Sequence, residues 1–389
     1  MRKYIFSAAA ITFIILLFLF NACESQKTDW QGRIEEVNGV TTVFNPEKPV
    51  NKNAGRILQL KEELRIKDSP GEFYFKSPEN IKIAPDGSIY ILDEEQFLKF
   101  NENGKFIQNL FKKGQGPGEF ERIQNYLFCG HEIVVFQMRP NKIVRLDMQG
   151  ALIKEIRPEE SVSKLFTCFD NEYIMANHSF PKLKKPGDEP EIIDIDWNLK
   201  WVTEEGKVES ANLDFPVKWF AKRLQNAIVS NFIVDFSAKS FMRKFLVIHH
   251  TQEYKLKLLD LESKQIVKTF MREYSQVKQK PEKSGTVEVR PNIYTLVPPV
   301  EYLNDIQKLF IQDSTIWIMT STMDKEKGIL VDVFDSSGEY TDNFYLPLPN
   351  QAKAEGISQY PITISGNFLF IVEYDENDIP SIVKYKIMD

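Results

Sequence analysis

Cysteine and histidine are scarce in this sequence, which has three cysteines and four histidines among 389 residues. No CxxC or HExxH spacing occurs, so the common zinc motifs are excluded. Besides Cys23 near the N-terminus there are Cys129 and Cys168, each near the end of an apolar segment. The sequence leaves open whether these two form a disulfide or stay as buried free thiols, because it does not supply the geometry that a bridge needs.

An excess of positive charge is also absent. The formal net charge is −6 at pH 7, whereas the phosphates of nucleic acids require a basic surface. We therefore expect no nucleic-acid partner. Beyond the first residues, no apolar stretch reaches the roughly 20 residues that a membrane-spanning helix needs. The main body is therefore expected to be water-soluble.

The N-terminal residues contain the long apolar run that the rest of the sequence lacks, and they are typical of a targeting segment. Arg2 and Lys3 precede an apolar, uncharged run over 5–20, and "LFNAC" places a small residue before Cys23. This end resembles the lipobox of bacterial lipoproteins, in which the cysteine is lipidated and becomes the mature N-terminus. An uncleaved anchor helix is the alternative. We expect an exported, membrane-anchored protein of the bacterial cell envelope, an outer-membrane lipoprotein facing the periplasm or the cell surface.

A repeated rhythm of short apolar runs organises the rest of the chain. Residues 77–110, "SPENIKIAPDGSIYILDEEQFLKFNENGKFIQNL", contain four such runs separated by "PDGS", "DEEQ" and "NENG", which is typical of a four-stranded antiparallel meander. The rhythm recurs, and the last unit has three runs, so the segment 55–66 is expected to supply its fourth strand and close a ring without a free edge. The blades of this ring are expected to begin near Ile81, Ile123, Leu165, Ile233, Ile306 and Ile362.

The rhythm therefore predicts an all-β fold, a six-bladed β-propeller of four-stranded antiparallel blades. We expect a lipoprotein signal peptide over 1–22, a tether and N-terminal extension over 23–54, and the propeller over 55–389. The first unit, continued to residue 120, resembles an NHL-type repeat. Together with the lipobox, "IEEVNGVTTVFNPEKP" and "GQGPGEF", it resembles the six-bladed β-propeller lipoproteins. That family is largely without assigned biochemistry, so the resemblance implies a fold more than a function.

The motif "PGEF" occurs twice, at 70–73 and 117–120, each time just ahead of a predicted innermost strand. It is expected to link the outer strand of one blade to the inner strand of the next, with Phe73 and Phe120 as plugs between blades. A phosphate-cradling loop is the alternative, but the Lys and Ser/Thr of a P-loop do not follow. The residues that shape the second copy are Gly114, Gly116, Pro117, Gly118 and Phe120.

The longest connections, 180–190, 206–230 and 275–301, all fall on the same predicted face of the ring. Within the second connection, apolar residues near helical spacing predict a short amphipathic helix over the mouth. This helix would cover a hydrophobic gap beside blade four or act as a ligand lid. The candidate residues of a binding face are Arg139, His178, His249, His250, Trp219 and Phe220.

Three functions from different classes remain open at this stage. We expect a binding or scaffold module that engages an envelope protein or glycan through its loop-rich face, rather than an enzyme. The alternative is a hydrolase or lyase of the NHL-like lactonase kind, with calcium or zinc in the central channel. Its candidate ligands, Asn80, Asn125 and Asp375, form no convincing set, so no metal site and no cofactor are expected. The third is a purely structural partner of an envelope complex.

Overall fold

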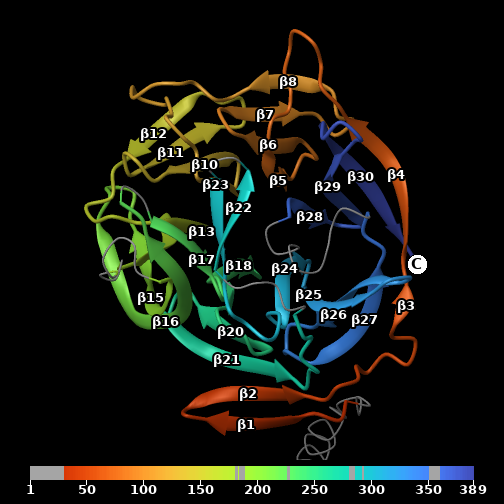
Figure 1. The fold of residues 1–389 in the computed structure, drawn as a ribbon. Coiled ribbons are helices and arrows are strands. Elements are labelled where there is room, and N and C mark those ends of the chain that lie inside the picture. The colour runs from red at the N-terminus through yellow and green to blue at the C-terminus, as the bar shows by residue number, and fades with distance from the viewer. Residues whose placement is uncertain are drawn as a thin grey trace, which may run out of the picture.

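The computed structural model describes residues 30–179, 183, 189–225, 228–279, 285–290, 293–349 and 360–389. Every regular element in these ranges is a β-strand, and six antiparallel sheets surround one central axis (Figure 1). The predicted six-bladed propeller is therefore confirmed. The predicted lipidation site, Cys23, lies outside the described residues. Within the described ranges, no helical segment has the length and apolarity of a membrane span.

The first three blades follow one another along the chain from the inner to the outer strand. Blade one contains β5 (Pro78–Ile83), β6 (Ile89–Asp93), β7 (Gln96–Phe100) and β8 (Phe106–Asn109). Blade two contains β9 (Asn125–Cys129), β10 (Glu132–Gln137), β11 (Lys142–Asp147) and β12 (Leu152–Ile156). Blade three contains β13 (Lys164–Phe169), β14 (Glu172–His178), β15 (Glu191–Val202), β16 (Val208–Arg223) and a fifth strand, β17 (Ile228–Phe232).

The other three blades incorporate strands from the N-terminal part of the chain. Blade four contains β18 (Ser237–Phe241), β19 (Phe245–His249), β20 (Lys255–Asp260) and β21 (Gln265–Arg272), extended by β2 (Val40–Asn45) and β1 (Arg33–Val37). Blade five contains β24 (Ile306–Gln312), β25 (Thr315–Asp324), β26 (Gly328–Phe334) and β27 (Tyr340–Leu346), with β3 (Arg56–Ile57) at its edge. Blade six contains β28 (Ile362–Ser365), β29 (Phe368–Tyr374), β30 (Pro380–Met388) and β4 (Gln59–Ile66). A separate hairpin contains β22 (Gly285–Arg290) and β23 (Ile293–Val297).

The ring closes where the two ends of the propeller meet in one sheet. Strand β4 pairs antiparallel with β30, from Ile66 opposite Ile382 to Gln59 opposite Met388. The outer strand of the last blade therefore comes from the start of the chain, as the sequence predicts. Because the last blade is completed in this way, the sheet edge that β30 would otherwise expose is covered.

Five of the six predicted blade starts agree with the structure, and the fourth does not. The sequence places the first strand of blade four at the apolar run after Asn231, whereas the inner strand is β18, beginning at Ser237. Phe232 instead belongs to β17, where it pairs with Trp219 of β16. An apolar run shows that a strand is buried, but it does not show which sheet the strand joins.

The "PGEF" copies lie between neighbouring blades. Phe120 is fully buried among residues of blades one and two, including Phe97 and Tyr126. Phe73 occupies the equivalent place between blades six and one. In the second copy, the amide of Phe120 donates to the carbonyl of Lys112 at 2.7 Å, and Lys113 forms a bridge with Phe120. The loop is therefore closed on itself and fixes the chain between two blades.

Inside this loop, the groups that a phosphate would need are already occupied. The amide of Gly116 donates to the carboxylate of Glu119 at 2.9 Å. The buried ammonium group of Lys142, in blade two, donates to the main-chain oxygen of Glu119 at 2.7 Å. Gly114 and Gly118 have positive φ angles of 154° and 72°, which other residues adopt at a cost. The loop geometry thus fits the linking role rather than anion binding.

A disulfide joins the inner strands of blades two and three. It connects Cys129 at the end of β9 with Cys168 in β13, across a Cα–Cα distance of 6.1 Å. Of the two alternatives that the sequence leaves open, the structure contains the bridge. Covalent links of this kind persist in oxidising compartments.

The N-terminal hairpin, β1 and β2, is bound to the rim of the ring. Strand β2 runs parallel to β21, from Thr41 beside Lys268 to Asn45 beside Arg272. The amide side chain of Asn45 donates to the carbonyl of Gly338 at 2.9 Å and accepts from the amide of Tyr340 at 2.8 Å. These bonds bridge blades four and five, so this part of the extension belongs to the folded body.

Candidate functional site

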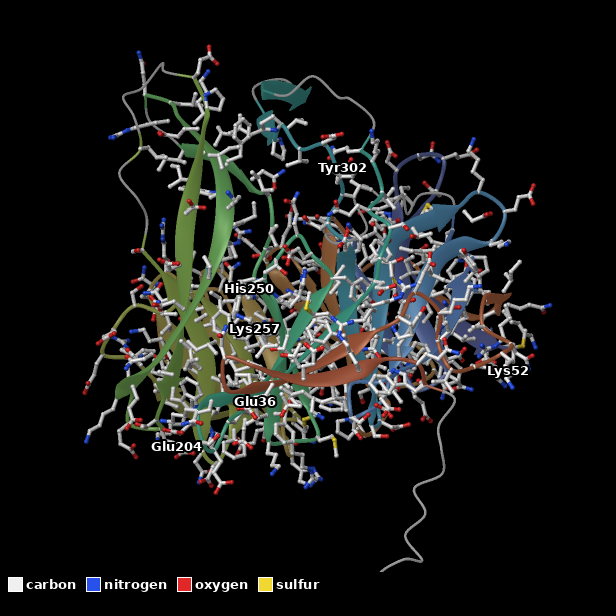
Figure 2. All side chains as sticks on the ribbon, turned by 90° about the horizontal axis from the view of Figure 1, so that it is seen from below. Glu36, Lys52, Glu204, His250, Lys257 and Tyr302 are labelled. Atoms are coloured by element: carbon white, nitrogen blue, oxygen red, sulfur yellow. A yellow bond between two sulfur atoms is a disulfide. The ribbon has the colours of Figure 1, made fainter. Side chains whose placement is uncertain are left out.

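The face with the long connections carries a projection formed by strands. Strand β15 pairs with β16 along its whole length, whereas only its lower part also pairs with β14, ending with His178 opposite Trp197. In Figure 2 these two strands rise above the ring. Strand β17 then adds to the end of β16. We use the name "tower" for the upper halves of β15 and β16 together with β17, β22 and β23.

The second outgrowth, the hairpin β22–β23, joins the first through a small core of its own. Figures 1 and 2 together show this hairpin above the middle of the ring. Leu296 of β23 is buried together with Phe220, Ile233 and Val234. The side-chain amide of Asn231 also donates to the carbonyl of Leu296 at 3.3 Å. The connections 206–230 and 275–301 are therefore packed against each other.

The predicted amphipathic helix is wrong, because residues 208–223 form strand β16. Side chains along this strand alternate between buried and exposed, with Phe215, Val217 and Trp219 on the buried side. A period of two residues is typical of a half-buried strand. Pro216, in the middle of the segment, also disfavours a helix.

Most of the predicted binding-face residues are not presented to solvent. Trp219 and Phe220 are 4% and 5% exposed, and His249 and His250 are each 4% exposed. Trp219 packs in the core between blades three and four, and Phe220 packs in the core of the tower. Of the two roles considered for this segment, the burial of both aromatics supports covering a hydrophobic gap rather than a ligand lid. They cannot provide an exposed recognition surface.

The remaining candidates lie apart. Arg139 is exposed in the turn between β10 and β11 of blade two. His178 is half-buried at the end of β14, with its ring centroid 4.3 Å from that of Trp197. Both His178 and His249 interact electrostatically with Asp235, which places these two histidines near one carboxylate.

The imidazoles of this region are uncharged at neutral pH. Burial lowers the pKa of His249 to about 4 and the pKa of His250 to about 3, because desolvation disfavours the charged ring. Burial also lowers the pKa of His178. The Nε2 atom of His249 is buried without a hydrogen-bond partner in the described part of the chain. These rings therefore contribute no positive charge to a ligand site.

The central axis carries functional groups that the sequence reasoning missed. The inner strands β5, β9, β13, β18, β24 and β28 surround it, and we call them the hub. Four of these strands carry a lysine: Lys82, Lys164, Lys239 and Lys308. The signal was present as "NIKI", "SKLF", "AKSF" and "IQKL", a lysine within each of four inner strands.

Burial and mutual repulsion act together on the hub lysines. Desolvation, and after it the charge of Lys239, lowers the pKa of Lys82 to about 7 and that of Lys308 to about 7. Desolvation and the charge of Lys164 lower the pKa of Lys239. In each case burial disfavours the ammonium form, and the neighbouring ammonium adds to the effect.

The residues considered as metal ligands for the lactonase-like alternative make contacts within the protein. The side-chain amide of Asn125 donates to the carbonyl of Leu165 at 2.8 Å, and the carboxylate of Asp375 accepts from the amide of Asn377 at 2.8 Å. The main-chain oxygen of Asn80 accepts from the hydroxyl of Tyr126 at 2.7 Å. In the residues that the structure describes, no group of three or more His, Cys, Asp and Glu is placed to hold a metal ion.

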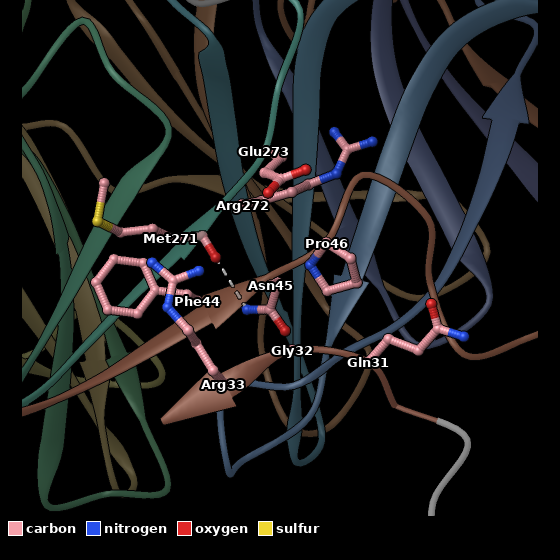
Figure 3. Close-up of a pocket in the computed structure, with 9 residues that line it drawn as sticks. All are labelled: Gln31, Gly32, Arg33, Phe44, Asn45, Pro46, Met271, Arg272 and Glu273. Carbon is pink, nitrogen blue, oxygen red and sulfur yellow. Dashed lines mark hydrogen bonds between the residues drawn. The ribbon is translucent and has the colours of Figure 1, made fainter. Parts of the chain in front are cut away.

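Two surface pockets lie away from the tower. One, of about 250 Å³, lies beside the N-terminal hairpin, where the guanidinium of Arg33 stacks over Phe44 at 4.3 Å (Figure 3). The other, of about 260 Å³, lies next to the disulfide. Its guanidinium, from Arg145, is already paired with Glu132 at 2.7 Å and with Glu204 at 2.5 Å. Neither pocket offers an uncommitted charge comparable to the hub.

With the fold and the hub described, comparisons with known proteins place the chain among six-bladed β-propellers. Residues 64–190 match the model of a family described as a 6-bladed beta-propeller. This match confirms the resemblance that the sequence motifs indicate, over the part of the chain that it covers. No curated protein matches the chain.

Solved structures from Bacteroides species are similar in fold. A member of the duf4221 family from Bacteroides vulgatus is 12% identical, with a TM-score of 0.50, over 86% of this chain and 99% of that one. A Bacteroides fragilis protein, described as exported, is 13% identical, with a TM-score of 0.45, over 90% and 100%. A streptogramin B lyase is 10% identical, with a TM-score of 0.43, over 85% and 98%. At these identities the likeness concerns the fold alone.

Proposed function

We propose that this protein is an exported, lipid-anchored propeller that acts as a binding or scaffold module in the cell envelope. It engages an envelope protein or glycan through the face that bears the tower. The observation that carries this proposal is that two long insertions, from different places in the chain, pack into one shared core above the same face. Binding residues are often found on loops and insertions that a rigid scaffold positions.

Export is supported by two independent features. The N-terminal pattern that ends at Cys23 is typical of a lipoprotein signal. The disulfide between Cys129 and Cys168 belongs to proteins of oxidising compartments rather than to the reduced cytosol. A lipid anchor on Cys23 would hold the protein at the membrane from its N-terminal side.

The place of the N-terminal hairpin favours an orientation with the tower pointing away from the membrane. Glu36, in this hairpin, lies on the lower half of the ring in Figure 2, whereas the tower rises from the upper face. Residues 23 and 30 are seven positions apart, so even a fully extended tether reaches no more than about 25 Å. The tower would then be accessible to partners in the surrounding compartment.

The proposal is tested by placing a photo-crosslinking amino acid at Ile192 on the tower and, as a control, at Ile107 on the outer edge of blade one. The two side chains are 49% and 48% exposed, so both positions tolerate a new group equally well. In intact cells we expect a discrete adduct with an envelope component from position 192 and none from position 107. Equal labelling at both positions, or no adduct from the tower, would contradict the proposal.

A further inference from the structure

The hub gathers four lysines from different blades around one axis. Lys82, Lys164, Lys239 and Lys308 belong to the inner strands of blades one, three, four and five. In a ring of six, blade one faces blade four across the axis (Figure 1). The ammonium groups therefore approach one region from several directions, although the chain as a whole has a net charge of −6.

Three of these lysines bond to a main-chain carbonyl of the next blade. Lys164 donates to the carbonyl of Phe236 at 2.6 Å, and Lys308 donates to the carbonyl of Tyr360. Lys82 donates to the carbonyl of Tyr126, and its Nζ is 3.3 Å from the side-chain oxygen of Asn125. An ammonium group carries three N–H donors. These carbonyl oxygens accept some of the N–H groups of each ammonium group. Because they are neutral, they do not balance its positive charge.

Lys239 differs from the other three. Its side chain makes no hydrogen bond or ion pair with any residue that the structure describes, and the residue is exposed to solvent. Desolvation is nevertheless the first cause of its lowered pKa, because the neighbouring protein takes the place of part of the water around its ammonium group. Its charge acts on Lys82, in the opposite blade, and on Lys308, in the next blade. This pattern places its ammonium group close to the axis.

Among the described residues, only one of the four hub lysines has a carboxylate partner. This is Lys164, which pairs with Asp235 at 3.0 Å. No carboxylate of a described residue acts on the pKa of Lys82, Lys239 or Lys308. Elsewhere in the same molecule a buried lysine has a carboxylate partner, as Lys142 has Glu155 at 3.0 Å.

We propose that the hub binds a small oxyanion with at least two negative charges, held by the ammonium groups of Lys82, Lys239 and Lys308. Like charges held close together are costly, and an anion that accepts their remaining N–H groups removes both the repulsion and the unused donors. Phosphate and a small polycarboxylate share this chemistry. The site is separate from the surface of the tower and does not depend on a macromolecular partner there.

The test uses the purified full chain without added oxyanion. Inorganic phosphate and citrate are titrated calorimetrically in parallel, against sodium chloride of equal ionic strength. We expect saturable binding of one or both oxyanions, and the better binder identifies the source of the shared chemistry. In Lys239→Met we expect the Kd to rise about tenfold or more, which corresponds to the loss of one hydrogen bond to a charged group.

A matched control uses another lysine that bonds to a carbonyl outside the hub. Lys99 is buried in β7 and donates to the carbonyl of Met148 at 2.7 Å. Lys99→Met should keep the Kd of the wild type. If neither oxyanion binds, or if Lys239→Met binds as tightly as the wild type, the inference is wrong. Crosslinking from Ile192 tests the tower independently, so either idea can fail while the other stands.

The thermal stability of Lys239→Met tests the repulsion between the hub lysines even in the absence of a ligand. Because the side chain of Lys239 bonds to no described residue, this variant should fold, and loss of one like charge should raise its midpoint of thermal unfolding in oxyanion-free buffer. The same concentration of oxyanion should raise the midpoint of the wild type more than that of the variant. An unchanged or lower midpoint in the variant would show that Lys239 has a structural role instead.

Discussion

The contact between blades four and five and the hub both contain cations that are partly desolvated, but they differ in how the charge is balanced. Between the blades, Arg272 donates to the carboxylate of Asp332 at 2.8 Å. The same carboxylate accepts from the hydroxyls of Tyr254 and Tyr340, each at 2.7 Å. Both charged side chains are almost fully buried, and the guanidinium stacks over Tyr340 at 4.6 Å. In the hub, by contrast, three ammonium groups have no carboxylate among the described residues.

This difference separates a structural charge from a binding charge. A buried ion is tolerated when a partner and further hydrogen bonds replace its hydration. Asp332 has three such donors, and its pair with Arg272 ties β21 to β26. Three hub lysines, Lys82, Lys239 and Lys308, have no carboxylate partner among the described residues, so their charge is left for something outside the chain. The comparison explains why we assign stability to one cluster and ligand binding to the other.

Removing the balanced charge should have the largest effect. Asp332→Asn leaves the guanidinium of Arg272 buried without its counter-ion, which typically costs about 3 to 5 kcal/mol. Urea unfolding of wild type and variant measures the difference in the free energy of unfolding. Glu35→Gln is the control, since the Arg33–Glu35 pair is exposed and should contribute little. If both variants lose equally little stability, the buried pair of Arg272 and Asp332 does not anchor blade four to blade five.

Replacing a lysine that has a carboxylate partner and replacing one that has none should change the free energy of unfolding in opposite directions. Lys142→Met removes an ammonium group that bonds to Glu119 and Glu155, so we expect a loss of about 1 to 3 kcal/mol. Lys239→Met should instead make the oxyanion-free protein more stable. The same urea experiment measures both. Equal losses in the two variants would remove the distinction between paired and unpaired lysines.

The sequence predicted the ring well because turns and short apolar runs are local signals. Residues 77–110 contain both, and the four strands predicted there are β5 to β8 of blade one. The helix prediction for the tower is wrong because Phe215, Trp219 and Phe220 also fit a helical spacing. The alternation of Phe215, Val217 and Trp219 on one side is the pattern of a strand. The disulfide depends on two inner strands lying side by side, which spacing along the chain does not show.

The hub was missed for a related reason. Each lysine taken alone is an ordinary polar residue in a strand, and most lysines are exposed. The cluster forms because the ring brings the inner strands of four blades around one axis. The strands that contain "NIKI" and "AKSF" then lie on opposite sides of this axis. Their missing counter-charge depends on which side chains surround them in space. Neither property can be derived from one strand.

The dependence of stability on pH tests the unbalanced hub most directly. The pKa of Lys82 and that of Lys308 are lowered to about 7 in the folded protein, from an ordinary value near 10.5, and that of Lys239 is also lowered. Between these values the unfolded chain binds more protons, so stability rises with pH and is reduced below about pH 7. The other groups facing the hub, His178 and His249, are already neutral in this window. Lys164 keeps Asp235 as its partner.

The measurement is the free energy of unfolding at about pH 7 and about pH 9, in oxyanion-free buffer, for the wild type and for Lys239→Met. We expect the wild type to be more stable at the higher pH, and the gain to be smaller in Lys239→Met, because Lys82 and Lys308 then lose a repulsive neighbour. Saturating phosphate at the lower pH should reduce the gain of the wild type as well. The same gain in both proteins, or no gain in the wild type, would contradict the claim that the hub holds unbalanced positive charge.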